Sequence, residues 1–161
     1  MNIEQTLTRL RRDVGQEVHV GPWLKIKQSD INLFAQATGD FQWIHVDPEE
    51  ARVRSPYKTT VAHGYFILGL LPQLTEFMKL PVLADENEKI IINYGLNKVR
   101  FPAPVPVDSE IRARTILTDV INKTQSIEIL RTVTIEIKGH SKPACVGESI
   151  TRVAFKSRED R

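Results

Sequence analysis

One apolar stretch decides the fold of this chain: Gly64-Tyr-Phe-Ile-Leu-Gly-Leu-Leu-Pro-Gln-Leu-Thr-Glu-Phe-Met78. Its first two turns are apolar on every side, and a helix of that kind is surrounded by the rest of its protein. Pro72 should kink or split this helix, because proline has no amide hydrogen for the helical ladder. The longest apolar run, Tyr65 to Leu71, is far too short to cross a bilayer, which takes about 20 residues. We therefore expect a layer that wraps a buried helix.

The downstream half of the sequence supplies that layer. Four strands are predicted there: Ile90 to Phe101, Glu110 to Val120, Ser126 to Lys138 and Ala144 to Phe155. In one strand apolar residues alternate with mostly polar ones, which is the period of a half-buried antiparallel strand. The alternating series is Ile127, Ile129, Arg131, Val133, Ile135 and Ile137. Loops are expected at residues 85–89, 122–124 and 139–143. A sheet that curls round one apolar helix is the α+β hotdog architecture.

Two helices are predicted ahead of the apolar stretch from their capping residues. Ser29 is the expected N-cap of the first helix. Gly39 should end it, because glycine adopts the left-handed conformation at a helix C-terminus without a Cβ penalty. The second helix should begin at Asp47-Pro48 and end before Ser55-Pro56. A connector of only a few residues, fixed at both ends, joins these helices.

The N-terminal segment predicts one helix and one strand. Ile3, Leu7 and Leu10 recur at helical spacing and indicate an amphipathic helix. Val18 to Lys27 is predicted to be a strand, with a bulge or turn at Gly21-Pro22. The N-terminus lacks the apolar core of a signal peptide.

The composition indicates one globular domain, residues 1–161, with 41% hydrophobic and 26% charged residues. The formal charge is +2 and the basic residues are scattered, so neither nucleic acid nor a membrane is an expected partner. The single Cys145 cannot form an intramolecular disulfide, which favours a reducing compartment and a cytoplasmic location. A single sheet of this kind leaves an exposed edge and half a cleft, so a homodimer is expected.

The connector and the start of the apolar helix carry the densest chemistry. Asp40 and His45 lie on the connector, and Gly64 begins the helix. A carboxylate and an imidazole that converge can activate water, and a backbone N–H at a helix start can stabilise a developing oxyanion. Taken singly, Asp40 is as well explained as a turn carboxylate and His45 as a hydrogen-bonded loop residue. Together they favour addition of water to an activated carbonyl compound.

Three segments of the chain resemble MaoC-like dehydratases and (R)-specific enoyl-CoA hydratases, which share the hydratase-2 signature. They are Ala37-Thr-Gly-Asp-Phe-Gln-Trp-Ile-His-Val-Asp-Pro-Glu-Glu-Ala51, Thr60-Val-Ala-His-Gly64 and Asn93-Tyr-Gly-Leu-Asn-Lys-Val-Arg-Phe-Pro-Ala-Pro-Val105. The resemblance covers nearly the whole chain. It implies reversible hydration of a trans-2-enoyl-CoA to an (R)-3-hydroxyacyl-CoA, without a metal or redox cofactor. It also implies that Asp40 and His45 are the catalytic pair and that the backbone N–H of Gly64 is the oxyanion donor.

The chain departs from the commonest family pattern, Asp-x-Asn-Pro-[Leu/Ile/Val]-His, at two positions. Gln42 stands for the asparagine and, as a side-chain amide, can form the same kinds of hydrogen bond. Trp43 stands for the proline and makes the lining of the site bulkier. The resemblance therefore implies the same chemistry with a different acyl preference. A branch with Gln-Trp at this point includes single-domain bacterial hydratases and chains similar to nodulation protein N.

Further residues of the matching segments are candidates for substrate binding. His63 either caps the buried helix or braces the oxyanion loop. Asn97 and Phe101 either line an acyl tunnel or serve in packing. Several cations suit the phosphates of coenzyme A, or else form a solvated face; these are Arg52, Arg54, Lys58, Lys98 and Arg100.

Three alternatives to a metal-free hydratase remain open at this point. A metal site from Asp40, His45, Asp47 and His63 is not expected, because no His-x-x-x-His or cysteine spacing supports it. A hotdog thioesterase would use the same helix end and one carboxylate to direct water to the carbonyl carbon. A non-catalytic hotdog would bind an acyl thioester or pair with a catalytic subunit, but would not require both Asp40 and His45.

Overall fold

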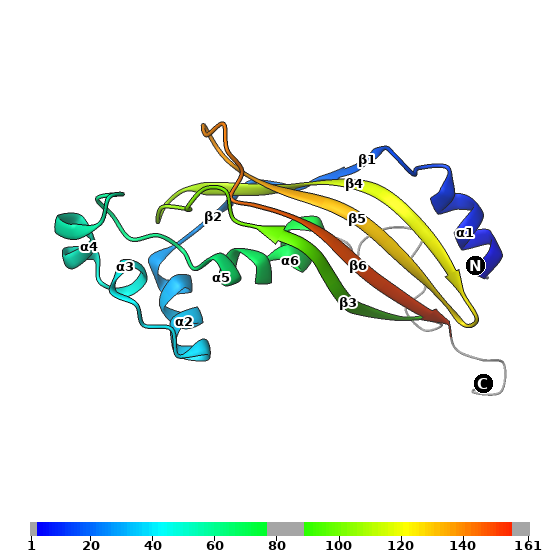
Figure 1. Ribbon diagram of the computed structural model, residues 1–161, viewed down its shortest axis with the longest axis horizontal. Coiled ribbons are helices and arrows are strands. Elements are labelled where there is room, and N and C mark those ends of the chain that lie inside the picture. Colours follow the sequence, from blue (N-terminus) through cyan, green and yellow to red (C-terminus); the bar gives the residue numbers. More distant parts are fainter. Residues whose placement is uncertain (1–2, 77–88, 156–161) are drawn as a thin grey trace.

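One antiparallel sheet forms the body of the molecule in the computed structural model, which describes residues 3–76 and 89–155 (Figure 1). Its six strands are β1 (Glu17–Val20), β2 (Leu24–Lys25), β3 (Lys89–Arg100), β4 (Glu110–Lys123), β5 (Ser126–Ile137) and β6 (Cys145–Phe155). The strand order is β1-β4-β5-β6-β3, and β2 also pairs with β4. The four predicted long strands are present. β4, β5 and β6 are neighbours in chain order, as in an antiparallel meander, but β3 pairs with β6 and not with β4. The hairpin between β4 and β5 turns at residues 124–125, slightly later than expected. Of the loop expected at residues 85–89, only Lys89 lies within the described residues, and it begins β3.

Six helices are present in the described part of the chain: α1 (Ile3–Arg11), α2 (Gln28–Thr38), α3 (Trp43–Val46), α4 (Pro48–Arg54), α5 (Gly64–Gly69) and α6 (Leu71–Thr75). Helix α1 lies at one end of the sheet, and α2 to α4 gather at the other (Figure 1). Helices α5 and α6 run along one face of the sheet between these ends. Strands and helices together form the predicted α+β hotdog arrangement. Within the described residues, no helix has the length and apolar character needed to span a membrane.

The apolar stretch differs from its prediction in two respects. It forms α5 and α6, separated at Leu70, so the expected split occurs two residues before Pro72. The helical pair is also not wrapped on every side: Ile67 and Leu74 are buried, but Tyr65 is 74% exposed. A single copy of the sheet covers only one side of the pair, which leaves the apolar opposite side open.

Helix capping follows the predictions at two ends and differs at a third. Gly39 ends α2 with φ 77°, and its N–H donates to Ala35 O. Asp47 caps α4 by accepting a hydrogen bond from Glu50 N. The predicted N-cap Ser29 is wrong: α2 begins at Gln28, and the Ser29 hydroxyl instead lies 3.3 Å from Asp30 Oδ1.

The predicted N-terminal strand is broken as expected near Gly21-Pro22, into β1 and β2. Gly21 N donates to Ala113 O of β4 across the break. A Cβ at Gly21 would lie 2.3 Å from Leu74 O, so only glycine lets the backbone of α6 approach this closely. This contact holds α6 against the first edge of the sheet.

Two separate clusters of buried apolar residues form the core. The first packs beneath α5 and α6 and includes Ile67, Leu74, Ile111, Ala113, Val133, Ile135, Ile137 and Cys145. The second packs beneath α1 and includes Leu7, Leu10, Leu117, Val120, Ile127, Ile129 and Val153. Between the clusters, the same face of β4, β5 and β6 carries a buried polar row, consisting of Thr115, Arg131, Ser149 and Thr151.

Candidate active site

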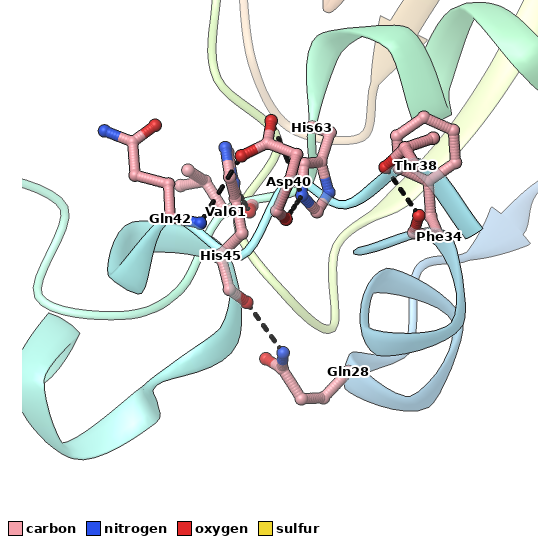
Figure 2. A network of polar contacts seen from close by, with 8 residues as sticks. All are labelled: Gln28, Phe34, Thr38, Asp40, Gln42, His45, Val61 and His63. Atoms are coloured by element: carbon pink, nitrogen blue, oxygen red, sulfur yellow. Dashed lines mark hydrogen bonds and ion pairs between the residues drawn. The ribbon is translucent and has the colours of Figure 1, made fainter. Parts of the chain in front are cut away.

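Asp40 is positioned by the end of α2. The left-handed conformation of Gly39 turns the chain sharply out of the helix, and Asp40 follows immediately. The backbone N–H of Gln42 donates to Asp40 Oδ1 at 3.3 Å, which restrains the carboxylate on its own loop (Figure 2). The Asp40 side chain is 53% exposed. A reactant can therefore reach the carboxylate.

His45 lies in α3, so the predicted connector is in part a short helical turn. Its Nδ1 is 2.6 Å from Val61 O (Figure 2). Since a carbonyl oxygen only accepts, Nδ1 carries the hydrogen and Nε2 keeps its lone pair. Gln28 Nε2 donates to His45 O at 2.8 Å, and Thr60 Oγ1 donates to Gln28 Oε1 at 2.5 Å. The bond to Val61 O keeps the imidazole in one tautomer with Nε2 available as a base, and the bonds through Gln28 hold the backbone of His45.

His63 joins the two predicted catalytic residues. Its Nε2 lies 3.0 Å from Asp40 O and 4.0 Å from Asp40 Oδ2. Its ring stacks on His45, with centroids 3.9 Å apart, and contacts the Phe34 ring at 5.0 Å. His63 is 3% exposed, and its side chain does not cap α5 although the residue occupies the N-cap position. The contacts therefore favour the bracing role over the capping role.

The pKa of the His45 imidazole lies below its ordinary value. Burial is the main cause, and the neighbouring His63 adds to the effect. The hydrogen bond to Val61 and the Asp40 carboxylate act in the opposite direction but do not cancel it. His45 is thus neutral at neutral pH, which is the state a general base requires.

Gly64 begins α5 directly after His63, so the fold brings it to the same site. A Cβ on Gly64 would lie 3.2 Å from two atoms of the Phe101 ring, which shows that the ring packs against this backbone. Tyr65 meets Phe101 edge to face at 6.0 Å. The first N–H groups of a helix have no acceptor within the helix. Because α5 has only six residues, we attribute any oxyanion stabilisation to the Gly64 N–H itself rather than to a helix dipole.

The other predicted substrate-binding residues differ in their exposure and in their contacts. Gln42 uses its backbone toward Asp40 while its side chain is exposed. Trp43 is half-buried beneath the Arg54 guanidinium, 4.9 Å from its ring centroid. Asn97 and Arg100 are exposed residues of β3, and Arg100 Nη1 donates to Val99 O. Phe101, which directly follows β3, differs from these two residues because its ring packs against Gly64.

Sequence reasoning missed three residues that support the site. Gln28 spans from α2 to the backbone of His45, Val61 fixes the His45 tautomer, and Phe34 packs on His63. Phe34 carried a signal, because its helical spacing places it one turn before Thr38-Gly39. Val61 acts through its carbonyl, which no side-chain pattern reveals.

Candidate residues for a metal centre and for a covalent nucleophile are also present in the described chain. Asp40, His45 and His63 each offer one ligand atom, all within 4.8 Å of one another. The two imidazole rings are stacked with 29° between their planes. The metal-free site stays a prediction from the sequence. Cys145 is buried, and burial raises the pKa of its thiol to about 11, so it is not a reactive thiolate.

Comparisons with known proteins give the family of the chain. The family model described as "MaoC like domain" matches residues 9–138. The chain is 46% identical over 153 residues to 3-hydroxyacyl-thioester dehydratase Z of Mycobacterium tuberculosis, covering 94% of this chain and 98% of that protein. It is 37% identical over 153 residues to nodulation protein N of Rhizobium leguminosarum bv. viciae, covering 94% and 93%.

A solved structure extends the similarity to the fold. The MaoC-like dehydratase from Rhodospirillum rubrum superposes with a TM-score of 0.68 at 18% identity, over 89% of this chain and 93% of that one. At this identity the likeness concerns the fold alone. Because the family model matches most of the chain and the relatives align over nearly their full lengths, the chain belongs to the MaoC-like domain family.

Proposed function

We propose that this protein is an (R)-specific enoyl-CoA hydratase, which adds water reversibly to a trans-2-enoyl thioester and, in reverse, dehydrates the (R)-3-hydroxyacyl thioester. One observation carries the proposal: a half-exposed carboxylate and a neutral imidazole with a free Nε2 lie together beside the first N–H groups of α5. The relatives named as dehydratases support the same reaction class.

The residues suggest how water is activated. Asp40 and His45 Nε2 hold one water molecule, and the pair accepts a proton as the water oxygen bonds to the β-carbon. The electron pair of the double bond moves through the α-carbon to the thioester oxygen. A proton then returns from the same pair to the α-carbon, on the face from which water was added. The reverse sequence of these steps expels water from the hydroxyacyl thioester.

Gly64 has a separate task in this scheme. The thioester oxygen becomes enolate-like when water adds, and the Gly64 N–H donates a hydrogen bond to that charge. The Phe101 ring packs against the same backbone, and Tyr65 meets that ring edge to face. One donor of this kind lowers the barrier by about 3 kcal/mol.

The decisive test is the hydration of crotonyl-CoA and longer enoyl-CoA substrates. Hydration is measured as the loss of the conjugated-thioester absorbance, and chiral analysis then identifies the product. We expect Asp40→Asn to lower kcat by at least about a hundredfold, because the amide cannot accept the proton. Asp108→Asn is the matched control, since Asp108 is an exposed carboxylate paired with Lys25. Equal rates for wild type and Asp40→Asn would refute the assignment.

The same assay separates the alternative activities. A thioesterase would release free thiol from a saturated acyl-CoA, because water would attack the carbonyl carbon. A non-catalytic binding protein would bind acyl-CoA saturably and turn over neither substrate. We expect the conjugated absorbance to fall without release of thiol.

A further inference from the structure

A cavity of about 460 Å³ lies between α5–α6 and the sheet. Pockets of about 300 to 1,000 Å³ suit small-molecule ligands. The helical wall begins at Tyr65, the residue after Gly64, and continues through Leu68 and Leu71. In the proposed function the Gly64 N–H binds the thioester oxygen, so the acyl chain of that thioester starts at this end of the cavity.

One part of the sheet wall is polar, although the strand pattern calls for apolar side chains there. The buried face of β6 runs from Cys145 to Val153, and these two residues belong to the two core clusters. Between them Ser149 and Thr151 are 9% and 1% exposed, and both line the cavity. Asn93 of β3, opposite Thr151 in the strand register, lines it as well. Neutral hydroxyl and amide groups thus replace aliphatic surface at one place in the wall.

The two hydroxyls of this wall differ in their bonding. Thr151 Oγ1 accepts a hydrogen bond from Arg131 Nη2 at 2.8 Å. Ser149 Oγ is buried and has no hydrogen-bond partner within residues 3–76 and 89–155. An unpaired hydroxyl inside a protein destabilises the folded state, whereas an alanine in its place does not carry that cost. The Ser149 hydroxyl is therefore better explained by a partner that enters the cavity than by the packing of the strand.

Ser149 needs only a small movement to meet such a partner. The residue lies in the cavity wall, and one rotatable bond separates its hydroxyl from the backbone, so a change of χ1 rotamer moves Oγ without moving β6. A serine hydroxyl is neutral and both donates and accepts, which suits a neutral oxygen atom of a ligand. The strand residues around it include Ile91, Leu96 and Val133, whose apolar side chains suit a hydrocarbon chain.

We propose that the cavity receives an acyl chain that carries a hydroxyl or ketone oxygen, and that Ser149 selects this chain by a hydrogen bond to that oxygen. This inference rests on the proposed function, because it names the substrate class of the same site. A plain chain would displace water from the polar part of the wall and leave the Ser149 hydroxyl unpaired. Oxygen-bearing chains are then preferred over plain chains of equal length.

Titration calorimetry with the wild-type protein and saturated thioesters tests this preference. Saturated thioesters lack the double bond to which water adds, so binding is measured independently of turnover. Octanoyl-CoA is compared with 7-oxooctanoyl-CoA and 7-hydroxyoctanoyl-CoA, and the ketone is then moved along chains of other lengths. We expect an oxygen-bearing member to bind about fivefold tighter or better where its oxygen reaches Ser149. Equal affinities at every length, or no binding of any member, would overturn the inference.

Two variants assign the preference to the hydroxyl of Ser149. Ser149→Ala should bring the affinities for the plain and oxygen-bearing chains together, whereas Ser149→Thr keeps a hydroxyl and should keep the preference. Ser141→Ala is the control, because Ser141 is an exposed residue of the loop between β5 and β6. A preference that is unchanged in Ser149→Ala would contradict the assignment.

The thermal stability of Ser149→Ala gives a second measurement. Because the hydroxyl has no partner in the described chain, its removal should leave the Tm of the ligand-free protein unchanged or higher. The oxygen-bearing thioester that binds tightest should then raise the Tm of the wild type more than that of the variant. A lower Tm of the ligand-free variant would show that the hydroxyl is bonded within the protein, and would overturn the inference.

Failure of this inference can be told from failure of the proposed function. Hydration of crotonyl-CoA without any preference for an oxygen-bearing chain would remove only the inference. A preference for the oxygen-bearing chain without any hydration would leave Ser149 as a binding residue and remove the hydratase assignment.

Discussion

Among the individual residues, His45 sets the pH dependence that we expect. Its folded pKa is lowered below the ordinary value of 6.5, and the neutral ring is the active form. The ratio kcat/KM should therefore stay level above pH 6.5 and fall as the pH drops through the lowered pKa. A pH–rate profile with crotonyl-CoA checks this, and an acidic limb centred above pH 6.5 would contradict it.

His63 is expected to act through His45 as a positioning residue. Its proximity helps to lower the pKa of His45, so His63→Gln should move the acidic limb of kcat/KM to higher pH. The loss of the ring that stacks on His45 should also lower kcat. His140→Gln is the control, because His140 lies in the distant hairpin loop between β5 and β6. A limb that stays in place in His63→Gln would show that the stacking is only structural.

The sequence indicated that Asp40 and His45 lie close together but not everything that orients them. Their proximity could be predicted because the residue types, their spacing and the flanking caps can all be read from the sequence. The role of Gln28 was hidden, since its partner is a backbone carbonyl 17 residues away. The helix start was misplaced at Ser29 for a related reason: a good capping residue is only a preference, and here tertiary contacts of Gln28 accompany an earlier start.

Among the elements, the end of α2 is expected to affect both stability and activity, because Gly39 ends the helix and Asp40 directly follows it. Ala at Gly39 would have to adopt φ 77°, at a cost of about 1 kcal/mol, with no other atom within 4 Å of the new Cβ. Gly139→Ala is a matched control, because Gly139 has φ 78° and equally open surroundings and lies in the loop between β5 and β6. Both variants should lose similar thermal stability, but only Gly39→Ala should also lose activity, since it disturbs the exit of Asp40. Equal activities of the two folded variants would refute this link.

The strands were predicted well because alternation and loop residues are local signals. The apolar helix was predicted less well, since local sequence shows that a surface is apolar but not what covers it. In the described chain, Tyr65 lies in that stretch and is largely exposed. The cover that the pattern implies is therefore absent from the part of the chain that the structure describes.

For the whole molecule, this missing cover and the open edge of the sheet support a homodimer. Among the described strands, β3 has β6 as its single neighbour, and it exposes the apolar side chains of Ile90, Ile92, Tyr94 and Leu96. We expect two copies to join along β3, giving twice the mass of 18.3 kDa in light scattering. The double variant Ile92→Lys/Leu96→Lys should be monomeric, whereas Ile116→Lys, equally exposed on β4, should stay dimeric. A monomeric wild type would exclude this assembly.

The polar row between the two core clusters has a further consequence for how the chain opens. Each cluster has its own helical cover, so the end of the sheet under α1 can lose its packing while the end that carries Asp40 and His45 stays intact. Amide hydrogen exchange should accordingly resolve two cooperative units with different opening free energies, with their boundary at Thr115, Arg131 and Ser149. The buried polar row would then be the boundary between two cooperative units, so that local unfolding of one half of the protein does not spread to the other half.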